Sequence, residues 1–448
     1  MVFSSFVFLL AFLPIVLLLY YLCPARLRNL VLLVFSLVFY AWGEPVYVLI
    51  MLFSIVFDYA NGRLIEHFKN KNCPGKAKAA LIVDLCGNLA ILGFFKYTDF
   101  VIGSINSITG AGLSLLHIAL PIGISFYTFQ TMSYTIDVYR GDAKMQKNFI
   151  TFGAYVALFP QLIAGPIVRF KDVAEQLDHR KETISQFSKG ILRFMVGLGK
   201  KVLIANQVGA LWSQIAAMPD SELTTAMAWL GVVAFTLQIY FDFSGYSDMA
   251  IGLGRMFGFY FLENFNFPYM SKTITEFWRR WHISLSSWFR EYVYIPLGGN
   301  RKGLVRQLFN IMVVWMLTGL WHGANWNFVL WGVYYGVLLM IEKLFLLKWL
   351  DKLPNWIGHI YSMFLVVIGW TIFAQTDIHQ LGEYLKTMFG IGHVAVADSD
   401  FLYFLGSNAV LLVALIAASI DYRVWMRRLK QGKDATIYDA IATSKGWT

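Results

Sequence analysis

The sequence has few charged residues. Asp, Glu, Lys and Arg make up 14% of its 448 residues, whereas an ordinary soluble domain has roughly 25%. Hydrophobic residues reach 58%, and Phe, Tyr and Trp together reach 17%. A soluble fold of this length does not have enough interior to bury so much apolar surface. The composition therefore excludes soluble, disordered and fibrous proteins and indicates a membrane protein with several spanning segments.

Cysteine and common catalytic motifs are also scarce. The three cysteines, Cys23, Cys73 and Cys86, have neither the spacing of a disulfide framework nor that of a zinc site. No GxxxxGK[ST] loop and no GxSxG motif occurs, which argues against a P-loop ATPase and against a nucleophile elbow. We therefore expect no metal and no permanently bound cofactor.

Eleven apolar runs approach the length of about 20 residues that a spanning helix needs, and they do not alternate as barrel strands do. They are residues 5–22, 29–43, 46–60, 79–96, 117–138, 190–214, 224–243, 304–320, 326–347, 356–374 and 402–420. Three further stretches, 149–167, 245–268 and 273–299, are interrupted by Pro, Gly or charges and predict re-entrant or buried segments. We therefore expect an all-α polytopic membrane protein, with spanning helices around a polar, partly irregular centre.

The charges predict an orientation. The net charge is +10, from 37 basic and 27 acidic residues, and basic residues concentrate on the cytoplasmic side of membrane proteins. If the N-terminus lies outside, most basic residues fall in cytoplasmic segments. These segments contain Arg26 and Arg28, residues 63–78, Arg140 with Lys144 and Lys147, Lys343 with Lys348 and Lys352, and residues 423–433. In this orientation the segments outside the membrane contain Glu44, Lys96 with Asp99, Asp220 with Glu222, and the acidic stretch 375–401. We expect the basic segments to contact anionic lipid and not nucleic acid.

Residues 273–301 form the densest polar segment, and Thr273 or Thr275 can cap a helix there. Counted along one helix, Trp278, Trp281, Leu285 and Trp288 share an apolar face, and Arg279, His282, Ser286 and Arg290 share an opposing polar one. An interfacial helix with tryptophan anchors explains this pattern. The alternative is a re-entrant helix that puts Arg279 and His282 into a central cavity.

Two other places combine polar residues with apolar runs. His322 lies between two such runs beside Gly323, and an ionisable group at membrane depth is a functional candidate, although a lone histidine is more often structural. Asp242 lies at the end of the run at 224–243, and Ser244, Ser247 and Asp248 follow it. They either end that helix or orient a histidine and line a polar tunnel.

His282 and His322 lie 40 residues apart, without a nucleophile motif or metal-ligand spacing. General base catalysis is the simplest assignment. A neutral imidazole would take the proton of an acceptor hydroxyl that attacks an activated acyl group, which is worth about 10²–10⁴ in rate. Asn325 or an arginine could stabilise the oxyanion of the thioester.

The phrases around these residues resemble the membrane-bound O-acyltransferase family. They are LIAGPIVRF at 162–170, DFSGYSDMAIGLG at 242–254, ENFNFPY at 263–269, ITEFWRRWHISL at 274–285, IPLGGNR at 295–301 and TGLWHGAN at 318–325. The resemblance covers about residues 120–340. It points to the bacterial polysaccharide branch and most to its alginate O-acetylation type, with the peptidoglycan type equally close and the teichoic acid D-alanine transfer type as a sibling.

This resemblance implies a fold and a reaction. His322 takes the place of the family's catalytic histidine, and His282 takes the place of its second functional histidine. The implied fold is a ring of about 11 transmembrane helices around a thinned centre, where a cytoplasmic acyl donor meets an acceptor from outside. A single membrane-embedded domain over 1–448 would contain N-terminal spans in 1–140, the catalytic core in about 120–340, C-terminal spans in 356–420 and a cytoplasmic tail at 421–448.

The implied substrate is a thioester, acetyl-CoA or an acyl carrier, in the cytoplasmic membrane of a bacterium. Candidates to hold its phosphates are Arg279, Arg280, Arg290 and Arg301; candidates to line the tunnel or orient a histidine are Asp242, Ser244, Asp248, Trp321 and Asn325. The expected partner is an extracytoplasmic acetyltransferase or another acyl-acceptor protein. D-Alanyl transfer to teichoic acid from a carrier protein is the alternative. A transporter of lipid-linked or polymeric substrates is a more distant one, and the absence of a half-to-half repeat weighs against it.

Overall fold

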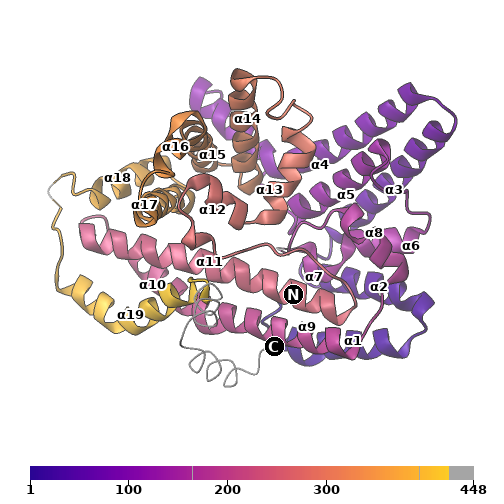
Figure 1. Ribbon diagram of the computed structural model, residues 1–448, viewed down its shortest axis with the longest axis horizontal. Coiled ribbons are helices and arrows are strands. Elements are labelled where there is room, and N and C mark those ends of the chain that lie inside the picture. The colour runs from indigo at the N-terminus through magenta and orange to yellow at the C-terminus, as the bar shows by residue number, and fades with distance from the viewer. Residues whose placement is uncertain (164, 393, 423–448) are drawn as a thin grey trace.

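The computed structural model describes residues 1–163, 165–392 and 394–422, which form helices joined by loops (Figure 1). Within that part of the chain there is no β-strand. The protein is an all-α polytopic membrane protein, as its composition predicts. The predicted cytoplasmic tail lies outside the described residues from position 423 onward.

Seven helices in the described ranges are long and apolar enough to cross a membrane. They are α3 (Val48–Asn70), α4 (Pro74–Thr109), α11 (Thr225–Met256), α14 (Leu304–His322), Trp326–Leu350, α17 (Asn355–Ala374) and α19 (Ser399–Ala418). The fifth consists of α15 (Trp326–Ile341), η6 (Glu342–Leu346) and α16 (Leu347–Leu350). Each of the seven overlaps one of the eleven predicted runs.

The other four predicted runs are also helical, but they are shorter or more polar. They are η1 (Phe8–Phe12) with α1 (Leu13–Leu22); α2 (Arg28–Ala41), which follows η2 (Ala25–Leu27); α5 (Ile124–Arg140); and α9 (Ile184–Gly199) with η3 (Lys200–Ala205) and α10 (Asn206–Ala216). The run predicted from residue 117 was placed too early, because α5 begins only after Pro121 and Gly123. The count of eleven is therefore supported by length and composition for seven runs.

The interrupted stretch at 149–167 contains only short helices, α6 (Phe149–Ala157) and α7 (Phe159–Leu162), followed by α8 (Phe170–His179). Residues of α6 and α7 are almost all buried in protein. This agrees with the prediction of a buried, irregular segment, since non-helical backbone at membrane depth needs a protein cover.

Two predicted helix ends were wrong. The helix predicted over 224–243 continues as α11 to Met256, so Asp242 and Asp248 lie within it and do not end it. The run predicted over 79–96 continues as α4 to Thr109 and ends at Gly110, whose φ of +67° suits glycine. Lys96 and Asp99 therefore belong to a long helix and not to an outside loop. In both cases the sequence contains no proline that would stop the helix.

Helix α11 crosses the middle of the molecule, with α9 packed along it (Figure 1). Glycines line this crossing. A Cβ added at Gly252 would lie 2.6 Å from the backbone N of Phe194, and one at Gly197 would lie 2.5 Å from the carbonyl oxygen of Gly245. The two backbones are thus closer than any larger side chain permits.

The polar segment between α11 and α14 is folded from short pieces. These are η4 (Pro268–Met270), α12 (Ile274–Arg280), α13 (Ile283–Phe289) and η5 (Arg290–Tyr294). After α17, helix α18 (Ile378–Met388) precedes α19. In Figure 1 the pieces α12 and α13 lie beside α14 and α15, and this corner of the molecule holds the candidate site.

Candidate functional site

The predicted single helix over 273–290 is interrupted at His282. Thr273 caps α12 by accepting a hydrogen bond from the backbone N of Glu276 at 2.9 Å. The helix ends at Arg280, His282 has φ +45° and ψ 55°, and α13 begins at Ile283. The prediction of one continuous helix was therefore wrong. A non-glycine residue in this left-handed region is costly and marks a site that surrounding packing holds in place.

The predicted apolar face is nevertheless buried on both sides of the interruption. Trp278, Trp281, Leu285 and Trp288 are all less than 9% exposed. The indole N–H of Trp288 donates to the carbonyl oxygen of Phe129 at 2.8 Å. Aromatic packing thus anchors both short helices to their neighbours.

A cavity of about 310 Å³ lies against α12, α13, η5 and α14. All four members of the predicted polar stripe line it: Arg279, His282, Ser286 and Arg290. His322, the last residue of α14, lines the same cavity. The fold therefore brings together two histidines 40 residues apart, which spacing alone does not predict.

His282 is 2% exposed and is held from one side of its ring. Its Nδ1 lies 3.1 Å from Oδ1 of Asn264, and the ring of Phe243 packs edge-on at a centroid distance of 4.8 Å. Its Nε2 has no hydrogen-bond partner among the described residues. One nitrogen is thus anchored, and the other is without a partner in that part of the chain.

His322 is surrounded by aromatic rings. The centroids of Trp321, Trp331 and Phe373 lie 5.0, 5.1 and 5.4 Å from that of its imidazole. Trp321 is buried, and its centroid is also 5.9 Å from that of His282. Trp321, one of the predicted orienting residues, therefore packs against both histidines.

The end of α14 is held by two residues of α4. The Lys96 ammonium group donates to the carbonyl oxygen of Trp321 and, at 3.1 Å, to Oγ of Ser125. The Tyr97 hydroxyl donates to the carbonyl oxygen of Leu320 at 2.7 Å. These donors satisfy carbonyls that a helix C-terminus leaves free, and the lysine places a positive charge where the helix dipole favours one.

The two predicted aspartates do not line the cavity. Asp242 forms an ion pair with Lys201, and Asp248 forms ion pairs with Lys200 at 2.7 Å and Arg193 at 2.6 Å. These pairs join α11 to α9 and η3, so the structure gives both aspartates a packing role and does not bring them to the histidines.

Two further predicted residues also lie outside the lining. Ser244 is 2% exposed, and its hydroxyl has no partner in the described part of the chain. Asn325 precedes α15, but its side chain makes no capping hydrogen bond there. Neither of them lines the cavity.

The four arginines proposed for phosphates divide into two pairs. Arg279 and Arg290 are exposed and line the cavity. Arg280 is ion-paired with Glu276 at 2.7 Å and donates to the carbonyl oxygen of Asn266. Arg301 is exposed but does not line the cavity. Of these four, only Arg279 and Arg290 therefore combine exposure with a place at the cavity.

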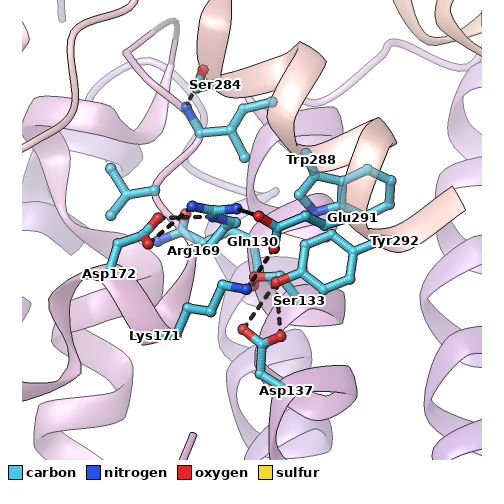
Figure 2. Close-up of polar contacts among 12 residues, drawn as sticks. Gln130, Ser133, Asp137, Arg169, Lys171, Asp172, Ser284, Trp288, Glu291 and Tyr292 are labelled. Atoms are coloured by element: carbon cyan, nitrogen blue, oxygen red, sulfur yellow. Dashed lines mark hydrogen bonds and ion pairs between the residues drawn. The ribbon is translucent and has the colours of Figure 1, made fainter. Parts of the chain in front are cut away.

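An ionic network supports the wall next to Arg290. Figure 2 shows Glu291 between Lys171 and Arg169, with Asp172 on the other side of Arg169. Glu291 pairs with Lys171 and with Arg169 at 2.5 Å each, and Arg169 pairs with Asp172 at 2.8 Å. Burial raises the pKa of Glu291, but the hydrogen bond from Lys171 and the charge of Arg169 outweigh burial and hold that pKa below its ordinary value. The network ties η5 to the start of α8.

Sequence reasoning missed three residues around the histidines: Lys96, Asn264 and Ser284. Asn264 lies in the phrase ENFNFPY and Ser284 in the phrase ITEFWRRWHISL, so both phrases contained a signal that was not assigned a role. The amide of Asn264 also donates to Oγ of Ser247 at 3.0 Å. The polar segment of α11 thus reaches His282 through Ser247, although not through the predicted aspartates.

No group of three or more His, Cys, Asp or Glu side chains suited to a metal ion occurs in the described residues. The two cavity histidines likewise have no carboxylate among the residues lining the cavity. The arrangement instead combines two imidazoles with two arginines in a largely apolar chamber. Such a set can move a proton and hold an anionic substrate.

Comparison with known proteins gives a consistent result. Residues 145–353, which include both histidines, match the model of the MBOAT, membrane-bound O-acyltransferase family. The probable alginate O-acetylase of Pseudomonas aeruginosa is 48% identical over 398 residues, which are 88% of this chain and 75% of that protein.

Two other relatives are more distant. The peptidoglycan O-acetyltransferase of Helicobacter pylori is 32% identical over 93% of this chain and 86% of its own. The teichoic acid D-alanyltransferase of Bacillus subtilis is 27% identical over 58% of this chain and 69% of its own. The similarity therefore extends along most of the chain for the first two and is partial for the third.

Proposed function

Because this chain belongs to the membrane-bound O-acyltransferase family and is an O-acetyltransferase, we propose that it transfers an acetyl group across the membrane. The donor is a cytoplasmic thioester, acetyl-CoA or an acyl carrier protein. The acetyl group is then attached to hydroxyl groups of a polysaccharide outside the cytoplasmic membrane of a bacterium. Relatives named for alginate and peptidoglycan support a hydroxyl-rich polymer as the final acceptor.

The observation that carries this proposal is the shared cavity of His282, His322, Arg279 and Arg290. In the proposed reaction His322 removes the proton of the acceptor hydroxyl as its oxygen attacks the thioester carbonyl. The carbon–sulfur bond then breaks, and the thiolate takes the proton back from the imidazolium. Atoms and charge balance, and no metal or redox partner is needed. Such a base is worth about 10²–10⁴ in rate.

The arginines have complementary roles in the proposal. Arg279 and Arg290 hold phosphate groups of the donor, since guanidinium groups bind phosphate in a bidentate manner. Both line the cavity and are exposed. Whichever of the two does not hold a phosphate is available to stabilise the oxyanion.

The orientation and partner belong to the same proposal. The N-terminus lies outside and the C-terminus in the cytoplasm, which places the donor on the side with more basic residues. An extracytoplasmic acetyltransferase, or another protein with an acceptor hydroxyl, receives the acetyl group and passes it to the polymer. The bilayer contributes anionic lipid to the basic segments.

The test compares the wild-type chain with His322→Ala in bacterial cells that supply their own envelope polymer. Cells receive radiolabelled acetate, and alkali-labile label in the polymer is counted, with chain abundance measured in the membrane fraction. We expect the label to fall at least about 100-fold in His322→Ala. Normal labelling by a folded variant would remove His322 from the mechanism.

A companion experiment with purified membranes tests two other functions. Transfer of radiolabelled D-alanine from a carrier-protein thioester, and not of acetyl, would replace the proposed acyl group. Movement of unmodified polymer without any new ester would show a transporter and contradict acyl transfer.

A further inference from the structure

Asn264 is the centre of a buried polar cluster that the proposed reaction does not use. It is 1% exposed and lies in the segment between α11 and η4. Its Oδ1 faces the backbone N of Ser284 at 3.2 Å, the hydroxyl of Ser284 at 2.9 Å and Nδ1 of His282 at 3.1 Å. On its other side, Nδ2 donates to Oγ of Ser247.

These contacts determine which ring nitrogen of His282 carries hydrogen. A backbone N–H can only donate, so the amide atom of Asn264 that faces Ser284 must be the oxygen. The Nδ1 atom of His282 faces that same oxygen at 3.1 Å. The Ser284 hydroxyl lies 3.4 Å from Nδ1, but its one hydrogen is directed to the closer Asn264 oxygen at 2.9 Å, so Nδ1 has only an acceptor before it and donates to that oxygen. A neutral imidazole carries one N–H, so its Nε2 has a lone pair.

Ser284 is itself held in place. Its hydroxyl accepts a hydrogen bond from the backbone N of Ile167 at 3.0 Å and donates to Asn264. Figure 2 shows Ser284 reaching from α13 toward the segment that leads to Arg169. The chain Ile167, Ser284, Asn264, His282 thus joins the irregular segment before α8 to the cavity wall.

The lone pair of Nε2 is buried and has no partner among the described residues, and His282 lines the cavity together with His322. A buried acceptor without a donor is unfavourable. Because His282 lines the cavity, an O–H or N–H group bound there is the candidate for the missing donor.

We propose that Asn264 is a positioning residue, which holds His282 as the Nδ1–H tautomer so that Nε2 accepts a hydrogen bond from an O–H or N–H group of the bound substrate. The tautomer follows from the contacts alone, whereas its use in acyl transfer rests on the proposed function. In this arrangement His282 binds the substrate through Nε2, and His322 remains the residue that transfers the proton.

Three variants test this assignment. Asn264→Leu removes the acceptor, and Asn264→Asp keeps an oxygen toward Nδ1. Asn61→Leu is the control for losing a buried amide, because Asn61 is also buried but lies on α3, outside the cavity. Acetyl transfer to envelope polymer is measured in membranes with added radiolabelled acetyl-CoA as the varied substrate. We expect Asn264→Leu to lower the maximal rate about tenfold with an unchanged KM for acetyl-CoA. Asn264→Asp should restore most of that rate, and Asn61→Leu should not lower it.

A second readout does not depend on activity. The purified chain is labelled with ring-¹⁵N histidine, and the signal of His282, one of 8 histidines, is identified by its absence in His282→Gln. Nitrogen atoms with and without hydrogen differ widely in ¹⁵N shift. We expect Nδ1–H in the wild type and in Asn264→Asp, and a mixture of tautomers in Asn264→Leu.

A wild-type signal for Nε2–H would overturn the assignment, as would an Asn264→Leu variant with unchanged tautomer and rate. If the wild-type tautomer is as expected while wild-type membranes transfer no acyl group, the proposed function fails and the role of Asn264 in setting the tautomer stands.

Discussion

At the scale of single residues, Lys96 links the helix scaffold to the site. Its ammonium group bonds the carbonyl oxygen of Trp321, the residue before His322. The contact neutralises the negative end of α14 and fixes the last turn, from which the His322 side chain leaves. A lysine within a candidate spanning helix is expensive unless it has such partners.

Replacing Lys96 by Met tests this link. The variant leaves the carbonyl of Trp321 without its donor and loosens the end of α14, so we expect the maximal rate of acetyl transfer to fall about tenfold, with little change in the KM for acetyl-CoA. Lys386→Met serves as the control, because Lys386 is exposed and pairs with Glu383 on α18. Full activity of a folded Lys96→Met variant would show that the contact does not position His322.

At the scale of elements, the crossing of α9 and α11 determines where the polar part of α11 lies. The glycines at the crossing allow backbone contact, and the ion pairs of Asp242 and Asp248 lie along the same interface. Close packing and paired charges together keep these carboxylates out of lipid. The same helix then presents Ser247 to Asn264.

We expect Gly252→Val to destabilise the chain, because its side chain would begin 2.6 Å from the backbone N of Phe194 and backbone cannot move aside. Overpacking of this kind costs about 1–3 kcal/mol or more. Gly199→Ala is the matched control on α9, since a Cβ there meets nothing within 4 Å. Thermal unfolding in detergent should show a lower midpoint for Gly252→Val and an unchanged or higher one for Gly199→Ala. Equal midpoints for the two would contradict close packing at this crossing.

At the scale of the whole molecule, orientation follows from where charge gathers. Residues 63–78, around the junction of α3 and α4, are mainly basic, and the segment between α17 and α19 is acidic. From the positive-inside rule we expect these segments to lie on opposite sides of the membrane. Under the proposed function, orientation decides from which side the thioester donor enters.

Cysteine labelling checks the orientation. One variant keeps Cys73 alone, and a second, free of native cysteine, carries Thr376→Cys in the exposed loop before α18. We expect a membrane-impermeant maleimide to label Thr376→Cys in intact spheroplasts and Cys73 only after lysis. The reverse pattern would place the N-terminus in the cytoplasm and the donor on the other face.

Much of the fold could be predicted from hydropathy, because a spanning helix must be long and apolar whatever its neighbours are. Helix ends were less predictable. Asp242, Asp248 and Lys96 looked like ends of spans because unpaired charges cannot stay in lipid, and only their partners in space explain why the helices continue past them. The kink at His282 was also missed, since nothing local requires a left-handed histidine.

The sequence by itself determined the class of the protein, the family phrases and the two histidines, because composition and local order carry that information. Only the tertiary structure decided that His282 and His322 share one cavity, that Arg279 and Arg290 join them while Arg280 is paired elsewhere, and that Asn264 anchors His282. The physical reason is that a cavity and a hydrogen-bond partner both depend on how separate segments pack together. The packing of two distant segments cannot be predicted from the spacing of residues within each segment.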